Sequence, residues 1–459
     1  MTSAKAPRVA GDAPFVERLF NPLFRFTSIP SSGGIVLLLV TIVALAWANS
    51  PWAESYHHLW ETPLGISVGP FAVSWTLHHF INDGLMVVFF FLVGLEIKRE
   101  FIAGELRTAR SAMLPMVAAL GGMVAPALIY LSLNGGEPSA RGWGVPMATD
   151  IAFALGVLAL FGTRAPVGLK VFLAALAIVD DLGAVLVIAL FYSTGLDWGA
   201  LGLSFGLLFI AVIANVAGVR RPWAYAIIGV ALWAAVASSG IHATVAGVLL
   251  ALTIPVRTRL DESAFIAGAR DALVDFERAA AATANDPDLT ALSNADHHAA
   301  IEELEVLADY AQPPLIRMEH ALHGIVAFGI MPLFALANAG VNLSGDAARV
   351  ALASPVAPGI FLGLLLGKPI GILGFSWIAV RMRLAALPGG VNWPMIAGAG
   401  LLGGIGFTMA LFIAGLAFTS AEMLDVAKLG IFAASAVAGI AGWLYLGRQL
   451  PPSEAAEGF

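Results

Sequence analysis

The sequence predicts an all-α polytopic membrane protein with twelve transmembrane helices, an inverted-topology repeat (helices 3–5 and 10–12) and two interrupted, crossing helices (4 and 11). Hydrophobic residues make up 59% of the chain and charged residues only 12%, about half the charged share of a soluble domain. Apolar segments follow one another with short connections, and most basic residues fall in every second connection. These three observations favour one helical bundle in a bilayer over several soluble domains.

The predicted number of helices is based on twelve apolar segments, although several have no more than the roughly 20 residues that usually cross a bilayer. They are 33–50, 77–97, 112–133, 144–162, 167–192, 199–218, 223–238, 241–255, 316–341, 358–380, 394–419 and 424–447. The chain contains no cysteine, which excludes disulfides and thiolate chemistry.

Alternation of the basic residues predicts the orientation of the chain. Lys98 and Arg99 begin a series of basic connections that ends with Arg448, and cytoplasmic connections are the ones rich in Lys and Arg. An even number of crossings then places both termini in the cytoplasm. Residues 1–30 lack an apolar signal core, so we expect a cytoplasmic N-terminal segment there and a cytoplasmic tail at 448–459.

Two pieces are predicted to lie outside the membrane. One is within the helical part 31–255, and the other separates that part from the helical part 316–447. Residues 64–75 alternate apolar and small side chains around Gly69-Pro70, which predicts a short β-hairpin on the outer face; an irregular loop is the alternative. Residues 256–315 form a polar cytoplasmic loop in which Ile301, Leu304 and Leu307 recur at helical spacing. We expect an amphipathic helix in a solvated insertion, with a regulatory role left open.

Two adjacent carboxylates, Asp180 and Asp181, lie within an otherwise uncharged apolar segment. Asp180 is ten residues after Lys170, which is about 15 Å along a helix and half of a ~30 Å bilayer core. A charge at that depth costs at least about 2.5 kcal/mol, so the pair needs a partner, a proton or a bound cation. Asp150 and Lys368 also fall at depth, which predicts one shared site for all four groups.

A purely structural ion pair is the alternative for these groups. Successive helical residues point about 100° apart, so Asp180 and Asp181 cannot face the same way. One of them can pair with Lys368 while the other faces a water-filled opening. We expect His242 to be a hydrogen-bonded structural group, and Asp83 to be either an anchor or a functional residue.

Backbone breakers mark helices 4 and 11. Pro146 precedes Asp150 in the fourth segment, and in the eleventh five glycines (Gly398, Gly400, Gly403, Gly404 and Gly406) precede Phe407-Thr-Met409. Broken helices in corresponding positions of two inverted triplets are typical of a transporter's binding site. Asp150 and Lys368 are candidates to neutralise the half-helix dipoles at such breaks. Close helix packing is the alternative explanation of the glycines.

Five segments resemble the signature motifs of the NhaA family of bacterial sodium/proton antiporters, which is itself a known example of inverted repeats. They are ATDIAFALGVLAL (148–160), ALAIVDDLGA (175–184), MPLFALANAG (331–340), GKP (367–369) and GIGFTM (404–409). The similarity runs from Ser32 to about Leu446. The insertion at 260–314 and the segment before Ser31 are longer than in compact members, and Gly324 stands where many relatives have proline.

The resemblance implies a role for each matching residue. It implies that Asp180 and Asp181 bind protons and Na⁺ or Li⁺, that Thr149 and Asp150 belong to the crossed broken helices, and that Lys368 pairs with Asp180. It also implies a cytoplasmic pH-sensing cluster: Glu96, Arg99, Glu100, Glu319, His320 and His323. A bacterial inner-membrane location, no cofactor, and a homodimer joined through the hairpin near Gly69 are further implications.

Competition between a cation and protons for the same carboxylates predicts electrogenic Na⁺(Li⁺)/H⁺ exchange that extrudes sodium. Hard oxygen ligands suit these ions, and a cation that displaces more than one proton moves net charge. Buried charge alone does not give the direction of coupling, so a proton-coupled symporter or a cation channel stays an alternative. An intramembrane aspartyl protease is a more distant one, since its Gly-x-Gly-Asp setting is absent.

Overall fold

The computed structural model describes residues 32–68, 71–193, 195–258, 260–285 and 294–451. The chain divides into two compact units. The first comprises residues up to Asn82, Ala103–Tyr192 and Ala327 onwards; the second comprises Asp83–Ile102 and Ser193–Val326. Apart from one two-stranded hairpin, the described elements are helical.

The N-terminal part of the first unit begins with a bent pair of helices, α2 (Ser32–Ala48) and α3 (Ala53–Glu61). Strands β1 (Pro63–Val68) and β2 (Phe71–Thr76) then pair antiparallel, with Pro63 opposite Thr76 and Val68 opposite Phe71. This pairing agrees with the hairpin predicted over 64–75, whose Gly69-Pro70 tip lies outside the described residues. A short helix α4 (Leu77–His79) and a π-helix η1 (Phe80–Leu85) follow.

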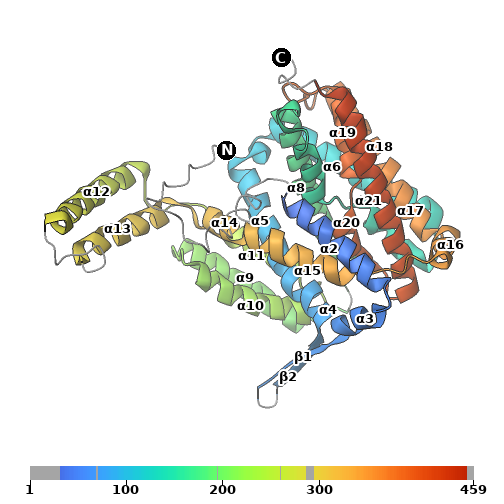
Figure 1. The fold of residues 1–459 in the computed structure, drawn as a ribbon, viewed down its shortest axis with the longest axis horizontal. Helices are drawn as coiled ribbons and strands as arrows, with labels where there is room; N and C mark the ends of the chain where they lie inside the picture. Colours follow the sequence, from blue (N-terminus) through green and yellow to red (C-terminus); the bar gives the residue numbers. More distant parts are fainter. Residues whose placement is uncertain (1–31, 69–70, 194, 259, 286–293, 452–459) are drawn as a thin grey trace. The chain divides into compact units, whose positions relative to one another are not determined.

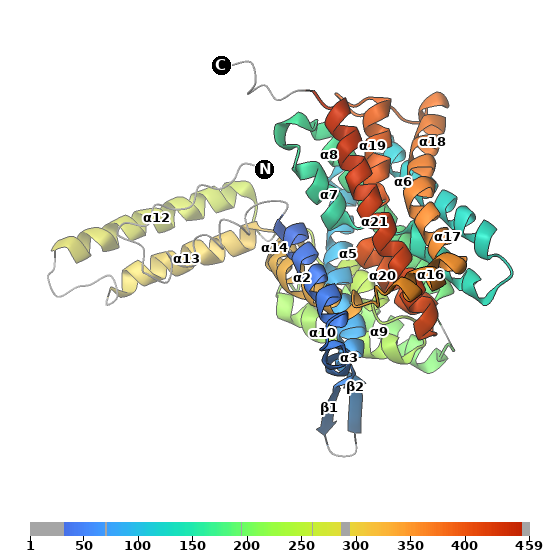
Figure 2. The same ribbon diagram turned by 45° about the vertical axis from the view of Figure 1, so that its right-hand side comes forward.

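Helices of very different lengths make up the rest of the first unit, with η2 (Glu105–Arg107) and η4 (Gly162–Arg164) as short connections. In chain order they are α6 (Ala109–Asn134), η3 (Pro138–Met147), α7 (Ile151–Ala159), α8 (Val167–Phe191), η5 (Val326–Ile330), α15 (Met331–Asn338), α16 (Gly345–Ala353), α17 (Val356–Leu362), η6 (Gly363–Gly367), α18 (Lys368–Arg381), α19 (Trp393–Gly403), α20 (Phe407–Ala417) and α21 (Ala421–Gln449). Helix α21 runs beside α17 and α19 (Figures 1 and 2).

The second unit contains α5 (Met86–Ala103, its last residue excepted), α9 (Trp198–Val216), α10 (Pro222–Ser238), α11 (Val245–Thr253) and α14 (Pro314–Ile325). Their shared core includes Leu95, Leu232 and Ala251. Helix α9 leaves Phe205 and Phe209 more than half exposed, as expected for a face that meets lipid.

The polar insertion of the second unit is a helical hairpin, α12 (Glu262–Asn285) and α13 (Ala295–Ala311), which lie side by side in Figure 1. Its ends meet, because Leu260 N donates to Tyr310 O at 3.2 Å and Leu315 N donates to Pro255 O at 3.2 Å. The amphipathic segment predicted around Ile301 is therefore part of α13, and a second helix precedes it.

Eight described helices are long and apolar enough to cross a membrane, or ten when each of two bent pairs counts as one span. Helix α10 has 17 residues and α11 only nine, so these two segments fall short of that length. The structure therefore confirms a helical, membrane-spanning chain. The count of twelve crossings and the inverted repeat stay predictions.

His242 has the structural environment that the sequence predicts. Its Nε2 lies 3.1 Å from Asp83 Oδ1, and its Nδ1 lies 2.8 Å from Thr244 Oγ1 just before α11. Trp233 Nε1 also donates to Asp83 O at 2.8 Å. Asp83 thus anchors neighbouring elements of the second unit.

Candidate functional site

Two helix breaks of the first unit contact each other. One is the extended segment 148–150 between η3 and α7; the other separates α19 from α20, whose axes differ by 47°. Asp150 N donates to Ile405 O at 2.6 Å, and Thr149 Oγ1 donates to Gly403 O at 2.9 Å. The breaks predicted at Pro146 and in the glycine run are therefore confirmed, and they meet.

Asp150 lies where two half-helices begin. Its carboxylate accepts Phe153 N at 3.1 Å in the first turn of α7 and Thr408 N at 3.1 Å in the first turn of α20. The Thr408 hydroxyl bonds to the same carboxylate. Helix N-termini carry partial positive charge, so this buried carboxylate neutralises two of them at once.

Lys368 is a second buried charge that contacts the breaks. Its side chain is 0% exposed, and Nζ donates to Asp180 Oδ2 at 2.5 Å and to Thr149 Oγ1 at 2.7 Å. Thr149 in turn bonds to Gly403 O at the C-terminal end of α19, where helix carbonyls carry partial negative charge. The pairing of Lys368 with Asp180 that the resemblance implies is therefore present.

The two adjacent aspartates of α8 are both buried, but they differ in their relation to Lys368. Asp180 and Asp181 are 1% and 2% exposed; Lys368 Nζ donates to Asp180, and the charge of Asp181 acts on the same ammonium. Asp180 Oδ1 has no hydrogen-bond partner among the described residues. A buried, unpartnered carboxylate oxygen next to a second carboxylate is suited to bind a small cation or a proton.

The structure adds two hydroxyl residues that sequence reasoning missed. Thr408 bonds to Asp150, and Ser435 Oγ of α21 accepts Phe407 N at 3.2 Å, which satisfies the first free N–H of α20. Thr408 lies within the signature segment GIGFTM (404–409), two residues after the glycine run, but no role was assigned to it. Ser435 lies in an apolar helix with no motif around it.

Four of the six residues implied as pH sensors lie together in the second unit. Arg99 of α5 pairs with Glu319 of α14 and with Glu100 at 3.2 Å, and Glu96 is within electrostatic reach of these three. Glu319 is buried, whereas His320 and His323 expose their side chains. The cluster therefore joins two helices through carboxylates and one guanidinium, and both histidines are exposed.

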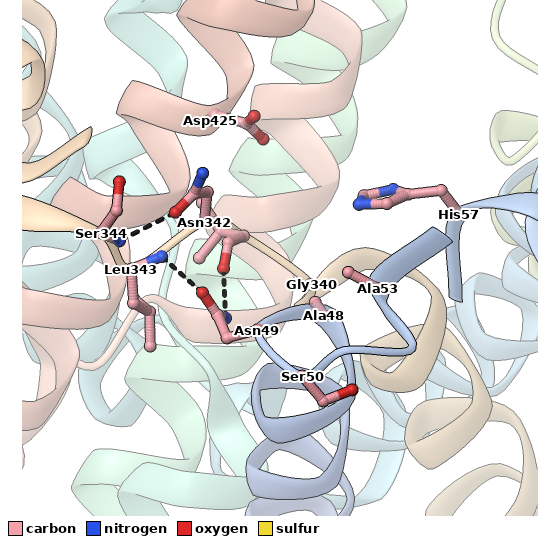
Figure 3. Close-up of a pocket in the computed structure, with 11 residues that line it drawn as sticks. Ala48, Asn49, Ser50, Ala53, His57, Gly340, Asn342, Leu343, Ser344 and Asp425 are labelled. Carbon is pink, nitrogen blue, oxygen red and sulfur yellow. Dashed lines mark hydrogen bonds between the residues drawn. The ribbon is translucent and has the colours of Figure 1, made fainter. Parts of the chain in front are cut away.

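A separate pocket of about 750 Å³ lies between the end of α2, residues 340–344 and the start of α21 (Figure 3). His57 and Asp425 point into it. Asn49 Nδ2 donates to Val341 O at 2.8 Å, and Asn49 Oδ1 accepts Leu343 N at 2.8 Å, so this amide is fully engaged in closing the wall. None of the buried charges described above lines this pocket.

The sequence of the chain is similar to those of known proteins. A family model described as Na+/H+ antiporter 1 matches residues 24–446. "Na(+)/H(+) antiporter NhaA" of Koribacter versatilis is 50% identical over 434 residues, covering 95% of this chain and 93% of the relative. The protein of that name from Oleidesulfovibrio alaskensis is 50% identical over 439 residues, covering 95% and 96%. "Na(+)/H(+) antiporter NhaA 2" of Sorangium cellulosum is 48% identical, covering 96% and 92%.

Proposed function

Because the chain belongs to the Na⁺/H⁺ antiporter 1 family, we propose that it extrudes Na⁺, and Li⁺, across a bacterial plasma membrane in exchange for protons. Members of this family are transporters and not enzymes, which excludes the alternative of an intramembrane aspartyl protease. The observation that carries the proposal is the buried pair Asp180 and Asp181, with one carboxylate oxygen of Asp180 unpartnered.

Exchange follows from competition for these oxygens. A dehydrated alkali cation requires hard, anionic oxygen ligands, and a carboxylate that binds it cannot keep its proton. Asp181 binds the cation directly in this proposal. Asp180 becomes a second ligand when its ion pair with Lys368 opens. Asp150 remains a fixed charge, because it accepts bonds from two helix N-termini in addition to the Thr408 hydroxyl.

The finer features of the mechanism are part of the same proposal. With twelve crossings, cytoplasmic termini and an inverted repeat, alternating access would come from rocking of the two inverted triplets against the remaining helices. Release of more than one proton per cation would make exchange electrogenic. The transported ions are substrates in this proposal, as for the sodium/proton antiporters that the chain resembles.

Purified protein in proteoliposomes is expected to move protons out of an acidic lumen when Na⁺ or Li⁺ is added outside. K⁺ in place of Na⁺ and protein-free liposomes are the controls, and an imposed membrane potential should change the initial rate. A symporter would acidify the lumen further, and a channel would carry Na⁺ without proton movement. A rate that ignores the imposed potential would contradict the electrogenic part alone.

We further propose that the cluster of Arg99 with Glu96, Glu100 and Glu319 sets the pH range of exchange. Arg99→Ala removes the cation that faces Glu319, Glu100 and Glu96, so the pH of half-maximal flux is expected to move by at least about 0.5 unit, equivalent to roughly 0.7 kcal/mol. Arg317→Ala is the matched control on α14, because Arg317 pairs with the half-exposed Asp309 instead. Overlapping pH profiles for wild type and Arg99→Ala would reject this role.

A further inference from the structure

Helix α18, which begins with Lys368, lies in direct backbone contact with α6. A Cβ atom added at Gly371 would overlap the carbonyl oxygen of Gly121, and one added at Gly121 would overlap the carbonyl oxygen of Gly371. Both Cβ–oxygen distances would be well below 3.0 Å, a separation that real Cβ atoms essentially never go below, so any side chain here would force the helices apart by roughly 1 Å. Glycine on both sides permits the observed separation.

The aliphatic stem of Lys368 lies against the same surface of α6. A Cβ at Gly122 would lie 3.7 Å from Lys368 Cδ and 3.0 Å from Ile372 Cγ1. The stem is fully buried, so it has no room to compensate for a displacement of its helix. A displacement of α18 away from α6 would therefore move Nζ from its present contacts with Thr149 and Asp180.

A π-helical turn directs Lys368 toward the site. In η6 the Lys368 N–H donates to Gly363 O, five residues earlier, and Pro369 has no N–H to donate. One π turn adds a residue to the helix and so rotates the residues after it. Gly367 makes this turn compatible with α6, because a Cβ there would lie 2.6 Å from Pro126 Cα.

We propose that Gly121, Gly122, Gly367 and Gly371 form a glycine seam whose function is to position the Lys368 ammonium between Thr149 and Asp180. The seam touches neither substrate nor proton; it acts through Lys368. This inference rests on the proposed function, because it concerns the charge partner of the proposed ion site. It assigns to these glycines a role in exchange beyond helix packing.

Gly371→Ala and Gly374→Ala form a matched pair on one helix. Both raise helix propensity, but a Cβ at Gly374 meets no atom within 4 Å. Na⁺-driven proton flux is expected to fall about 100-fold in Gly371→Ala, the effect of a ~1 Å misplacement in an active site, and to stay within about twofold in Gly374→Ala. The pH of half-maximal flux should move in Gly371→Ala only.

Gly122→Ala tests the same idea with a smaller displacement and guards against misfolding of Gly371→Ala. It is expected to lose about tenfold in flux through contact with Ile372, and the added change Ile372→Ala should restore most of that loss. Size-exclusion profiles of the purified variants report folding independently of flux.

Wild-type-like flux and pH profile in a folded Gly371→Ala protein would overturn the seam's role, as would failure of Ile372→Ala to rescue Gly122→Ala. Equal losses in Gly371→Ala and Gly374→Ala would do the same, since the seam is absent at Gly374. Absence of Na⁺-driven flux in wild type would instead refute the proposed function, so the two failures are distinguishable.

Discussion

Asp181→Asn is expected to abolish Na⁺- and Li⁺-driven proton flux. Asparagine keeps the size of the side chain but can neither release a proton nor supply a negative charge to a cation in a dry site. Losing about 3 kcal/mol of cation binding, a typical cost of an uncompensated buried charge, corresponds to more than a 100-fold loss in affinity. The measurement is the initial rate of proton release from proteoliposomes across a range of Na⁺ concentrations.

Asp425→Asn is the matched control for this experiment. Asp425 belongs to the same unit, but its side chain is 52% exposed and its nearest cation, Lys428 Nζ, is 3.9 Å away. Proton flux through the Asp425→Asn variant should remain within about twofold of wild type, because exposed ion pairs contribute about 1 kcal/mol or less to stability. Substantial flux in Asp181→Asn would place the ion site elsewhere.

Lys368→Met is expected to destabilise the fold as well as impair exchange. It leaves the Asp180 carboxylate buried without its ammonium partner, and breaking a buried ion pair from one side costs about 3–5 kcal/mol. The readout is the thermal unfolding of the protein in detergent, measured in parallel with flux.

The double variant Lys368→Met/Asp180→Asn separates charge from packing. With both charges removed, no unpaired ion is left, so most of the lost thermal stability should return. Flux should not return, because the proposed site has lost a carboxylate. If the double variant were as unstable as the single one, packing of the Lys368 stem, and not its charge, would explain the destabilisation.

The sequence predicted the breaks well because their causes are local. Proline removes a donor and glycine weakens a helix wherever they occur, so Pro146 and the run that ends at Gly406 could be recognised without tertiary information. Depth along an apolar segment likewise predicted that Asp150, Asp180 and Lys368 belong together. The choice of Asp180 over Asp181 as partner came from the family resemblance, since helical spacing shows only that the two diverge.

The remaining features depend on contacts that no local pattern reveals. A hydroxyl in a membrane helix often bonds to its own backbone, so nothing marked Thr408 or Ser435 as bonding across to another segment. Hydropathy also predicted residues 241–255 as one helix. In the structure Gly240 adopts a φ of 84°, a turn follows it, and helix α11 begins only at Val245. The homodimer stays a prediction, because its interface would lie between two copies of the chain.

The closed base of the α12–α13 hairpin has a practical and evolutionary consequence. Since Pro255 and Leu315 already share a hydrogen bond, a chain could pass from α11 to α14 with the whole hairpin removed or exchanged. An insertion with adjacent ends can be gained or lost without disturbing the helices on either side. This junction is accordingly the natural place to graft a rigid soluble module, which would give a small membrane protein the extra mass and asymmetric outline needed for particle alignment in electron microscopy.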